Sequence, residues 1–304
     1  MKIYVAGHKG LVGSAIVRAI EAEGKHTWIG RTRAELDLLD RKDVFEFLVK
    51  EKPDAVVIAA AKVGGIQANN TFPVEFLSQN LQIETNLMDG AHVAQIERLL
   101  FLGSSCVYPK LAQQPIKEEY LLTGELEKTN EAYALAKISG LKLVQAYRNE
   151  YGHKWISAMP TNMYGPGDNF DLENSHVLPA LIRKFHDAKT NGSDSVTLWG
   201  TGSPMREFLH SDDLGRACVF LLEQYDDDVA INIGVGEDVT IMDLAGLIGK
   251  IVGFQGDIVW DRTKPDGTPR KLLDVSRITA LGWKPLISLE DGIRSTYEWF
   301  QANH

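Results

Sequence analysis

The feature that most constrains the fold is a glycine-rich turn at the very start of the chain. Residues 2–6 predict a short buried strand, glycine recurs at every third position over residues 7–13, and an amphipathic helical pattern extends to about residue 24. A strand, a glycine turn and a helix N-terminus in this order make an anion cradle, because free backbone N–H groups and the helix dipole face a phosphate. The sequence therefore predicts a dinucleotide site at Gly7, His8, Lys9, Gly10, Leu11, Val12 and Gly13.

The residues after the second predicted strand favour NADP over NAD. Residues 26–30 predict that strand, and an NAD site usually places an acidic residue at its end for the ribose 2′-hydroxyl. Here the chain has Arg31 and Arg33, and guanidinium groups bind a phosphate in bidentate fashion. We therefore expect NADP(H), with Arg33 at the 2′-phosphate. We assign Asp37 to the adenine end of the site, while Asp37 and Asp40 both also suit the N-cap of the next helix.

Strands and helices alternate through the first half of the chain, which predicts an α/β protein with a Rossmann-type, doubly wound parallel sheet. Residues 54–61 are continuously apolar, as expected for a strand that helices cover on both faces. Ligands bind at the carboxyl ends of strands in such sheets. The strands predicted over residues 99–105 and 154–159 therefore place these side chains at the cofactor: Leu102, Ser104, Pro160, Asn162 and Met163.

Tyr133 and Lys137 are spaced to lie one turn apart on the same face of a helix. A phenol has an ordinary pKa of about 10, and a nearby lysine charge lowers that pKa by stabilising the phenolate. Such a tyrosine can donate a proton to a carbonyl oxygen while a hydride reaches the carbon, and the lysine can also hold ribose hydroxyls. Ser104 can orient the same carbonyl. Together with the dinucleotide site, this pair predicts a reductase.

Charge and composition argue against several kinds of partner. The net charge of −9 and the isoelectric point near 5.4 disfavour binding to nucleic acid or to an anionic membrane. No apolar run reaches membrane-spanning length, and a strand that begins at Lys2 leaves no room for a signal peptide. Cys106 and Cys218 are too few for a disulfide framework or a zinc cluster, and the histidines show no metal-ligand spacing. We expect a cytoplasmic protein without a metal site.

The regular alternation ends near residue 168, which predicts a second, smaller domain. We assign residues 1–168, with about 203–234, to the NADP-binding domain, and about 169–202 and 235–304 to a mixed α/β substrate domain. The elements expected in the latter are a polar loop, a helix, a strand, a helix capped by Thr240, a strand and a final helix, at residues 169–175, 177–188, 196–202, 240–252, near 258, and 289–302.

The glycine turn, Ser104 at a strand end and the Tyr133–Lys137 pair resemble the extended short-chain dehydrogenase/reductase superfamily. Within it, longer strings resemble the GDP-L-fucose synthase family, and the likeness covers essentially the whole chain. These strings are AAKVGGI, FLGSSCVYPK, PTNMYGP, PMREFLH and KPDGTPRK, at residues 60–66, 101–110, 160–166, 204–210 and 264–271.

This resemblance implies a bifunctional NADPH-dependent 3,5-epimerase and 4-reductase that converts GDP-4-keto-6-deoxy-D-mannose to GDP-L-fucose. It also implies a homodimer, formed through the helical patterns at residues 73–95 and 130–150. For the nucleotide-sugar it assigns Lys184, Trp199, Arg206 and Asp266. Arg183, Arg270 and Lys271 offer further positive charge for a pyrophosphate, and the role of Lys271 stays open.

Epimerisation requires a base and an acid on opposite faces of the sugar. A ketone at carbon 4 acidifies the hydrogens on carbons 3 and 5, because the enolate spreads its charge onto oxygen. By the resemblance, Cys106 is the base, and His176 is the acid and also contacts the cofactor. A thiol with an ordinary pKa of about 8.5 can act as a base when a cation lowers that pKa, and an imidazole titrates near neutrality. The expected catalytic set is Ser104, Cys106, Tyr133, Lys137 and His176.

Two other functions fit parts of the sequence. The first is a nucleotide-sugar 4-epimerase or 4,6-dehydratase with tightly held NAD, but Arg31 and Arg33 stand where those enzymes have an acidic residue, and Cys106 follows the serines. The second is a non-catalytic NADP-binding protein, which the intact Tyr133 and Lys137 pair disfavours.

Overall fold

The computed structural model describes residues 1–172, 174–264 and 266–304. Glu173, within the predicted polar loop, and Pro265, within the string at residues 264–271, lie outside the described residues.

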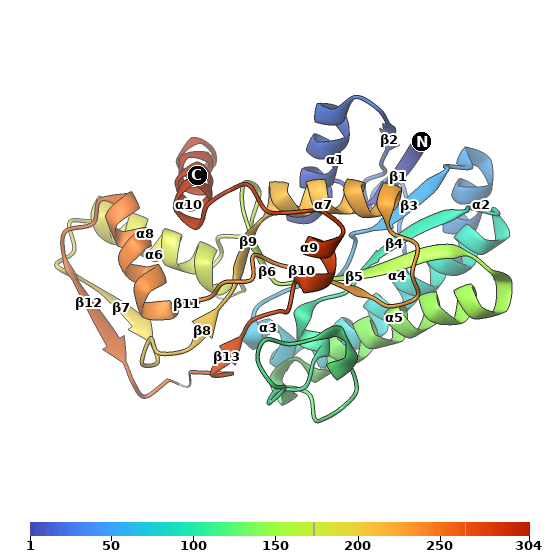
Figure 1. The fold of residues 1–304 in the computed structure, drawn as a ribbon. Coiled ribbons are helices and arrows are strands. Elements are labelled where there is room, and N and C mark those ends of the chain that lie inside the picture. Colours follow the sequence, from blue (N-terminus) through green and yellow to red (C-terminus); the bar gives the residue numbers. More distant parts are fainter. Residues whose placement is uncertain (173, 265) are drawn as a thin grey trace.

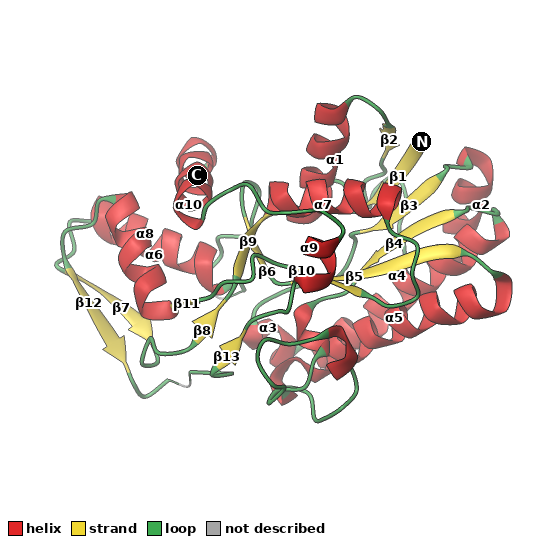
Figure 2. Ribbon diagram, in the orientation of Figure 1, coloured by secondary structure: helices red, strands yellow, loops and turns green. Residues whose placement is uncertain are grey.

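A six-stranded parallel sheet organises the first part of the molecule (Figures 1 and 2), in the order β10-β5-β4-β3-β1-β2. From β1 the chain first moves outward to β2 and then returns to add β3 on the other side, so the winding reverses between β1 and β3. Ligands bind at such a switch point. The predicted doubly wound Rossmann-type fold is confirmed. The strands are β1 (Lys2–Ala6), β2 (Thr27–Ile29), β3 (Ala55–Ile58), β4 (Arg98–Leu102), β5 (Lys154–Pro160) and β10 (Ile231–Ile233).

Helices cover both faces of this sheet because side chains alternate along each strand. Ile3 and Val5 of β1 pack in one buried cluster with α1 and α7, whereas Tyr4 and Ala6 pack in another with α2, α4 and α5. Both clusters are fully excluded from water at their centres, which supplies the main driving force for folding. The helices are α1 (Leu11–Glu23), α2 (Arg41–Glu51), α4 (Pro73–Val93), α5 (Glu131–Tyr151) and α7 (Ser211–Gln224).

Local residues set the helix ends close to where the sequence predicts them. Asp40 is the N-cap of α2, since its side chain accepts a hydrogen bond from the backbone N–H of Asp43 at 3.1 Å. This resolves the choice between the two aspartates, because Asp37 is left outside the helix. Helices α1 and α5 both end at a glycine in the left-handed region, Gly24 and Gly152.

Most of the remaining elements extend the molecule beyond the carboxyl ends of the sheet strands (Figure 1). They are α3 (Ile66–Thr71), η1 (Ser105–Val107), η2 (Glu118–Tyr120), η3 (Lys128–Asn130), β6 (Asn162–Tyr164), α6 (Val177–Thr190), β7 (Ser195–Trp199), β8 (Met205–Arg206), β9 (Phe208–His210), β11 (Val239–Thr240), α8 (Ile241–Val252), β12 (Asp257–Asp261), β13 (Arg270–Lys271), α9 (Ser276–Ala280) and α10 (Leu289–Asn303).

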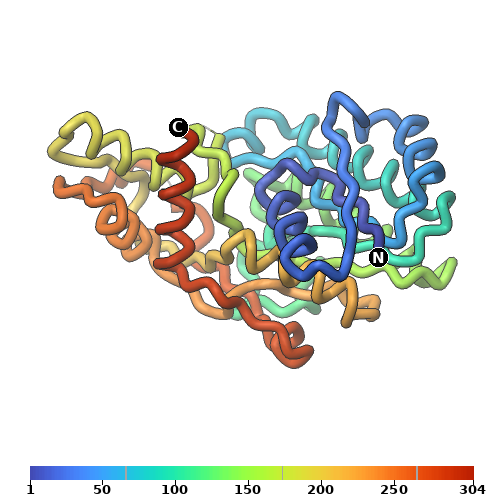
Figure 3. The backbone as a smooth tube through the Cα atoms, turned by 90° about the horizontal axis from the view of Figure 1, so that it is seen from above, coloured from blue at the N-terminus to red at the C-terminus, as the bar shows by residue number. Residues whose placement is uncertain are grey.

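A third hydrophobic cluster lies among α6, β7, α8 and α10, with Phe185, Ile248 and Phe300 fully buried in it. Figure 3 shows the C-terminal helix α10, in red, on the side of this cluster that faces the six-stranded sheet. Ile278 and Trp283 instead pack in the cluster shared by α1 and α7, although they fall in the range that we assign to the substrate domain. The division into two domains with the stated boundaries remains our proposal.

Glu207, between β8 and β9, joins three distant segments. Its fully buried carboxylate accepts hydrogen bonds from the backbone N–H groups of Val235, Gly236 and Leu273, at 2.6, 2.7 and 3.1 Å. A side chain at Gly234 would collide with this carboxylate, so glycine is required there. Glu207 thus fixes the end of β10 and the segment that follows β13 against β8.

We expect Glu207→Gln to lower the free energy of unfolding by about 1–3 kcal/mol, because the amide NH2 leaves a buried backbone N–H without an acceptor. Urea unfolding followed by circular dichroism measures the change. Glu237→Gln, an exposed change in the neighbouring loop, is the control and leaves stability unaltered. Equal stability of the two variants would contradict the role assigned to Glu207.

Candidate active site

A cavity of about 1550 Å³ opens at the carboxyl ends of the sheet strands and continues toward β7, β8 and β13. Most of the site residues predicted from the sequence line it: Gly7, Gly10, Leu11, Val12, Arg33, Asp37, Leu102, Ser104, Cys106, Tyr133, Lys137, Pro160, Asn162, Met163, His176, Lys184, Trp199, Arg206 and Asp266. His8, Lys9 and Gly13 are not among the lining residues of the described chain.

The glycine turn leaves the N-terminus of α1 open to a ligand. Gly7 adopts a φ of 88°, and its carbonyl accepts a hydrogen bond from the N–H of Gly10 at 2.9 Å. A side chain on Gly13 would collide with that carbonyl, so α1 packs against the turn only with glycine there. No side chain caps α1 and no acidic residue lies in its first turn. Its free N–H groups therefore suit a phosphate. His8 instead lies beside Trp28, with 5.7 Å between ring centroids.

The two arginines after β2 have different surroundings. Arg31 lies over the ring of Phe47 and makes an ion pair with Glu51 at 3.1 Å. Arg33 is exposed at the cavity, and within the described part of the chain its one ion pair is a long one of 3.5 Å with Asp37. Arg33 is thus the more available of the two for a 2′-phosphate, because the guanidinium of Arg31 already contacts Glu51 and Phe47.

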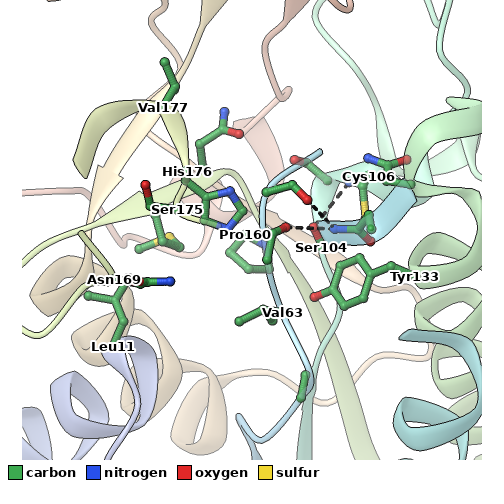
Figure 4. Close-up of a pocket in the computed structure, with 18 of the residues that line it drawn as sticks. Leu11, Val63, Ser104, Cys106, Tyr133, Pro160, Asn169, Ser175, His176 and Val177 are labelled. Carbon is green, nitrogen blue, oxygen red and sulfur yellow. Dashed lines mark hydrogen bonds between the residues drawn. The ribbon is translucent and has the colours of Figure 1, made fainter. Parts of the chain in front are cut away.

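Ser104, Cys106 and Tyr133 lie together on one side of the cavity, at the end of β4 and the start of α5 (Figure 4). The Ser104 hydroxyl accepts a hydrogen bond from the N–H of Cys106 at 3.4 Å, which holds the first turn of η1. Burial raises the pKa of Tyr133 well above its ordinary value, and Cys106 and Glu84 raise it further. The sequence predicts a lowering by Lys137. This prediction is wrong for the protein by itself, because burial dominates the shift and the two charges that add to it, Cys106 and Glu84, also raise the pKa of Tyr133.

The charge of Lys271 lowers the pKa of both groups expected to move protons in epimerisation, Cys106 and His176. Burial raises the pKa of the Cys106 thiol, and the Lys271 charge is the largest influence that opposes this rise. His176 is exposed to the cavity, and its ring points toward the wall that carries Ser104 (Figure 4). The surrounding protein still lowers the pKa of His176 through burial, and Lys271 lowers it further. The sequence left the role of Lys271 open. It could not show that β13 pairs with β8, which brings Lys271 beside Arg206 at the cavity.

Positive charge and one exposed indole mark the far end of the cavity. Lys271 pairs with Arg206 across β13 and β8, so two half-buried cations line the same wall. Trp199 is 59% exposed, and the ammonium groups of Lys184 and Lys264 lie 5.5 and 5.4 Å from its ring centroid. Cations beside an aromatic face suit a nucleoside diphosphate. Lys264 begins the string at residues 264–271, but no pattern in the sequence marks it as a binding residue.

Asp266 closes the turn after β7. Its carboxylate accepts hydrogen bonds from the N–H and the hydroxyl of Thr201, at 2.7 and 2.8 Å. These bonds give Asp266 a structural task besides the substrate contact that the resemblance implies.

Away from the cavity, ligand atoms of Glu23, His26 and Glu223 lie within 4.8 Å of one another. The imidazole of His26 already hydrogen-bonds to Glu223 at 2.9 Å and contacts the N-terminal amine. The expectation of no metal site therefore stays a prediction.

A parallel sheet with a glycine turn at its switch point, beside a serine, a tyrosine and a lysine in one cavity, defines the class of nucleotide-dependent dehydrogenases and epimerases. The family model described as the NAD dependent epimerase/dehydratase family matches residues 3–234, and the chain belongs to this family.

Curated relatives are similar over nearly their whole length. The chain is 59% identical to a putative GDP-L-fucose synthase 2 of Arabidopsis thaliana, an alignment that covers 99% of this chain and 92% of the relative. It is 52% identical to a GDP-L-fucose synthase of Escherichia coli K12, over 99% of this chain and 97% of the relative. The crystal structure of a GDP-L-fucose synthetase from Naegleria fowleri bound to NADP matches with a TM-score of 0.92 and 29% identity, covering 99% and 94% of the two chains. The resemblance seen in the sequence is confirmed. No helix in the described ranges is long and apolar enough to cross a membrane.

We expect Lys271→Met to raise the pKa of the Cys106 thiol, because the cation that favours the thiolate is removed. The pH dependence of iodoacetamide alkylation at Cys106, followed by mass spectrometry, should therefore move to higher pH. Lys250→Met, an exposed change on α8, is the control and leaves the profile in place. An unshifted profile in Lys271→Met would show that Lys271 does not act on the thiol.

Proposed function

We propose that this chain is an NADPH-dependent enzyme that inverts carbons 3 and 5 of GDP-4-keto-6-deoxy-D-mannose and reduces carbon 4, which gives GDP-L-fucose. The relatives named GDP-L-fucose synthase, at 52–59% identity, support this substrate. The observation that carries the proposal is that groups suited to reduction, Ser104 and Tyr133, line the same cavity as groups suited to epimerisation, Cys106 and His176.

In reduction, Tyr133 gives its proton to the oxygen on carbon 4, while the hydroxyl of Ser104 donates a hydrogen bond to the same oxygen. Bound NADPH supplies the hydride. The raised pKa of Tyr133 keeps the phenol protonated at neutral pH, which is the form that a donor requires. Lys137 holds the cofactor ribose, and Arg33 binds the 2′-phosphate.

In epimerisation, the thiolate of Cys106 removes a proton next to the ketone and becomes a thiol, and the imidazolium of His176 donates a proton to the opposite face and becomes a neutral imidazole. Exchange of protons with solvent restores the two charged forms for the second carbon. Burial disfavours charge on both groups, so the neutral thiol and the neutral imidazole dominate without substrate. Lys271 favours the thiolate but disfavours the imidazolium, and it therefore aids the base at the expense of the acid. Ser104 stabilises the enolate oxygen between the two transfers.

The far end of the cavity holds the nucleotide part of the substrate. Arg206 and Lys184 bind the pyrophosphate, Trp199 offers a stacking face, and Asp266 contacts the nucleotide while it holds the turn at Thr201. The convergence of cations here, on a chain with net charge −9, supports a ligand with several negative charges.

We include a homodimer and a cytoplasmic location in this proposal. Exposed apolar side chains on α4 and α5, among them Val74, Val93 and Leu135, support a contact between two copies of these helices. Sedimentation equilibrium should give twice the chain mass of 33.7 kDa, and a monomer would refute this part. The free thiols of Cys106 and Cys218 suit a reducing compartment.

Product analysis in heavy water tests the proposal. We expect solvent deuterium at carbons 3 and 5, because Cys106 and His176 exchange protons with the solvent between turnovers. Cys106→Ser should lose deuterium at both carbons, while Tyr133→Phe should lose reduction and keep both exchange and NADPH binding. If the wild-type product carries no deuterium at these carbons, the epimerase activity is refuted and only the reductase activity remains. Loss of NADPH binding in Tyr133→Phe would mean that the role of the tyrosine is wrong.

A further inference from the structure

The mechanism above gives no task to a carboxylate that lies directly behind Lys137. Glu84, near the middle of α4, places its Oε1 3.1 Å from the Nζ of Lys137. Each side chain of this pair is only 2% exposed. The pair thus lies inside the protein, while Lys137 still reaches the wall of the cavity.

The surrounding residues make room for this pair and fill the rest of the space. A side chain on Gly140, one turn after Lys137, would come within 2.8 Å of Glu84 Oε2 and would collide with Phe101. The lysine Nζ also lies 4.6 Å from the centroid of the Phe101 ring. The glycine on α5 therefore permits α4 to bring its carboxylate to the lysine.

Within the described ranges, Lys137 is the one cation paired with Glu84, and neither oxygen of this carboxylate has a hydrogen-bond partner. Burial raises the pKa of Glu84, and Lys137 is the charge that opposes this rise. A buried ion pair contributes little to stability compared with apolar side chains of the same volume. Stability alone therefore does not account for a glutamate at this position.

We propose that Glu84 is a positioning residue for Lys137 in the reaction proposed above, on which this inference rests. Its carboxylate fixes where the ammonium lies and supplies the counter-charge of that ammonium. The ion pair holds the ammonium at this place, and the lysine N–H groups remain available to the cofactor at the cavity wall.

The position of Glu84 also affects the proton donor. The ionisable groups that bear on Tyr133 are Cys106 from η1, Glu84 from α4 and Lys137 from its own helix, with His176 and Lys271 across the cavity. A negative charge at Glu84 raises the pKa of Tyr133. Removal of that charge lowers the pKa, so the phenol loses its proton at a lower pH.

The test compares Glu84→Gln with wild type in NADPH-dependent reduction of the keto sugar from pH 6 to about 11, because the pKa of Tyr133 lies well above the ordinary phenol value of about 10. We expect the fall of kcat at high pH to begin about one unit lower in Glu84→Gln, the order of shift that one neighbouring charge produces. We also expect the Kd for NADPH, followed by fluorescence, to rise several-fold because the lysine loses its fixed position. Glu84→Asp keeps the charge and should restore the wild-type pH profile. Glu46→Gln, an exposed change on α2, should match wild type in both measurements.

An unshifted pH profile together with an unchanged Kd for NADPH in Glu84→Gln would overturn the inference. A uniform fall in kcat without either change would show a merely structural role and would also overturn it. If Glu84→Gln does not fold, Glu84→Asp decides the question, because the shorter side chain must weaken NADPH binding if position matters. Failure of the proposed function looks different, since wild type itself would then not reduce the keto sugar.

Discussion

The close approach of Gly13 to the carbonyl of Gly7 is the contact on which the cofactor end of the molecule depends. It brings the N-terminus of α1 against the turn that leaves β1, at the point where the sheet changes its direction of winding. Free N–H groups and the helix dipole then face the space that a pyrophosphate occupies in this class of protein. The other helices of the sheet follow from ordinary alternation of side chains, but this contact tolerates no side chain at all.

The rest of the cavity is assembled from segments that are far apart in the sequence. Cys106 follows β4, His176 begins α6, and Lys271 ends β13, so three separate connections must be held in register for these groups to meet. Glu207 provides much of that register because its buried carboxylate binds the backbone beyond β10 and beyond β13. The positions of the groups that we propose for proton transfer thus depend on Glu207, which is not among the residues that line the cavity.

Sequence reasoning succeeded where a function depends on neighbours along the chain. The turn at residues 7–13 and the spacing of Tyr133 and Lys137 are local patterns, and the strands and helices around them lie close to their predicted bounds. It was less informative where a side chain acts across elements. Glu84 is one of several buried positions at helical spacing on α4, which could have marked it as a buried charge, but only the fold brings it to Lys137. The burial that reverses the predicted effect of Lys137 on Tyr133 is likewise a property of tertiary packing.

Arg33 stands on an exposed loop after β2, the edge strand of the sheet, whereas the groups that we propose for proton transfer follow other strands. Its one ion pair within the described residues is a long one, to Asp37. Arg31, two residues earlier, is anchored by Phe47 and Glu51. Cofactor preference and sugar chemistry are therefore separable traits in this architecture. If Arg33 binds the 2′-phosphate as proposed, substitutions in this loop would change the choice of dinucleotide and leave Ser104, Cys106, Tyr133 and His176 as they are.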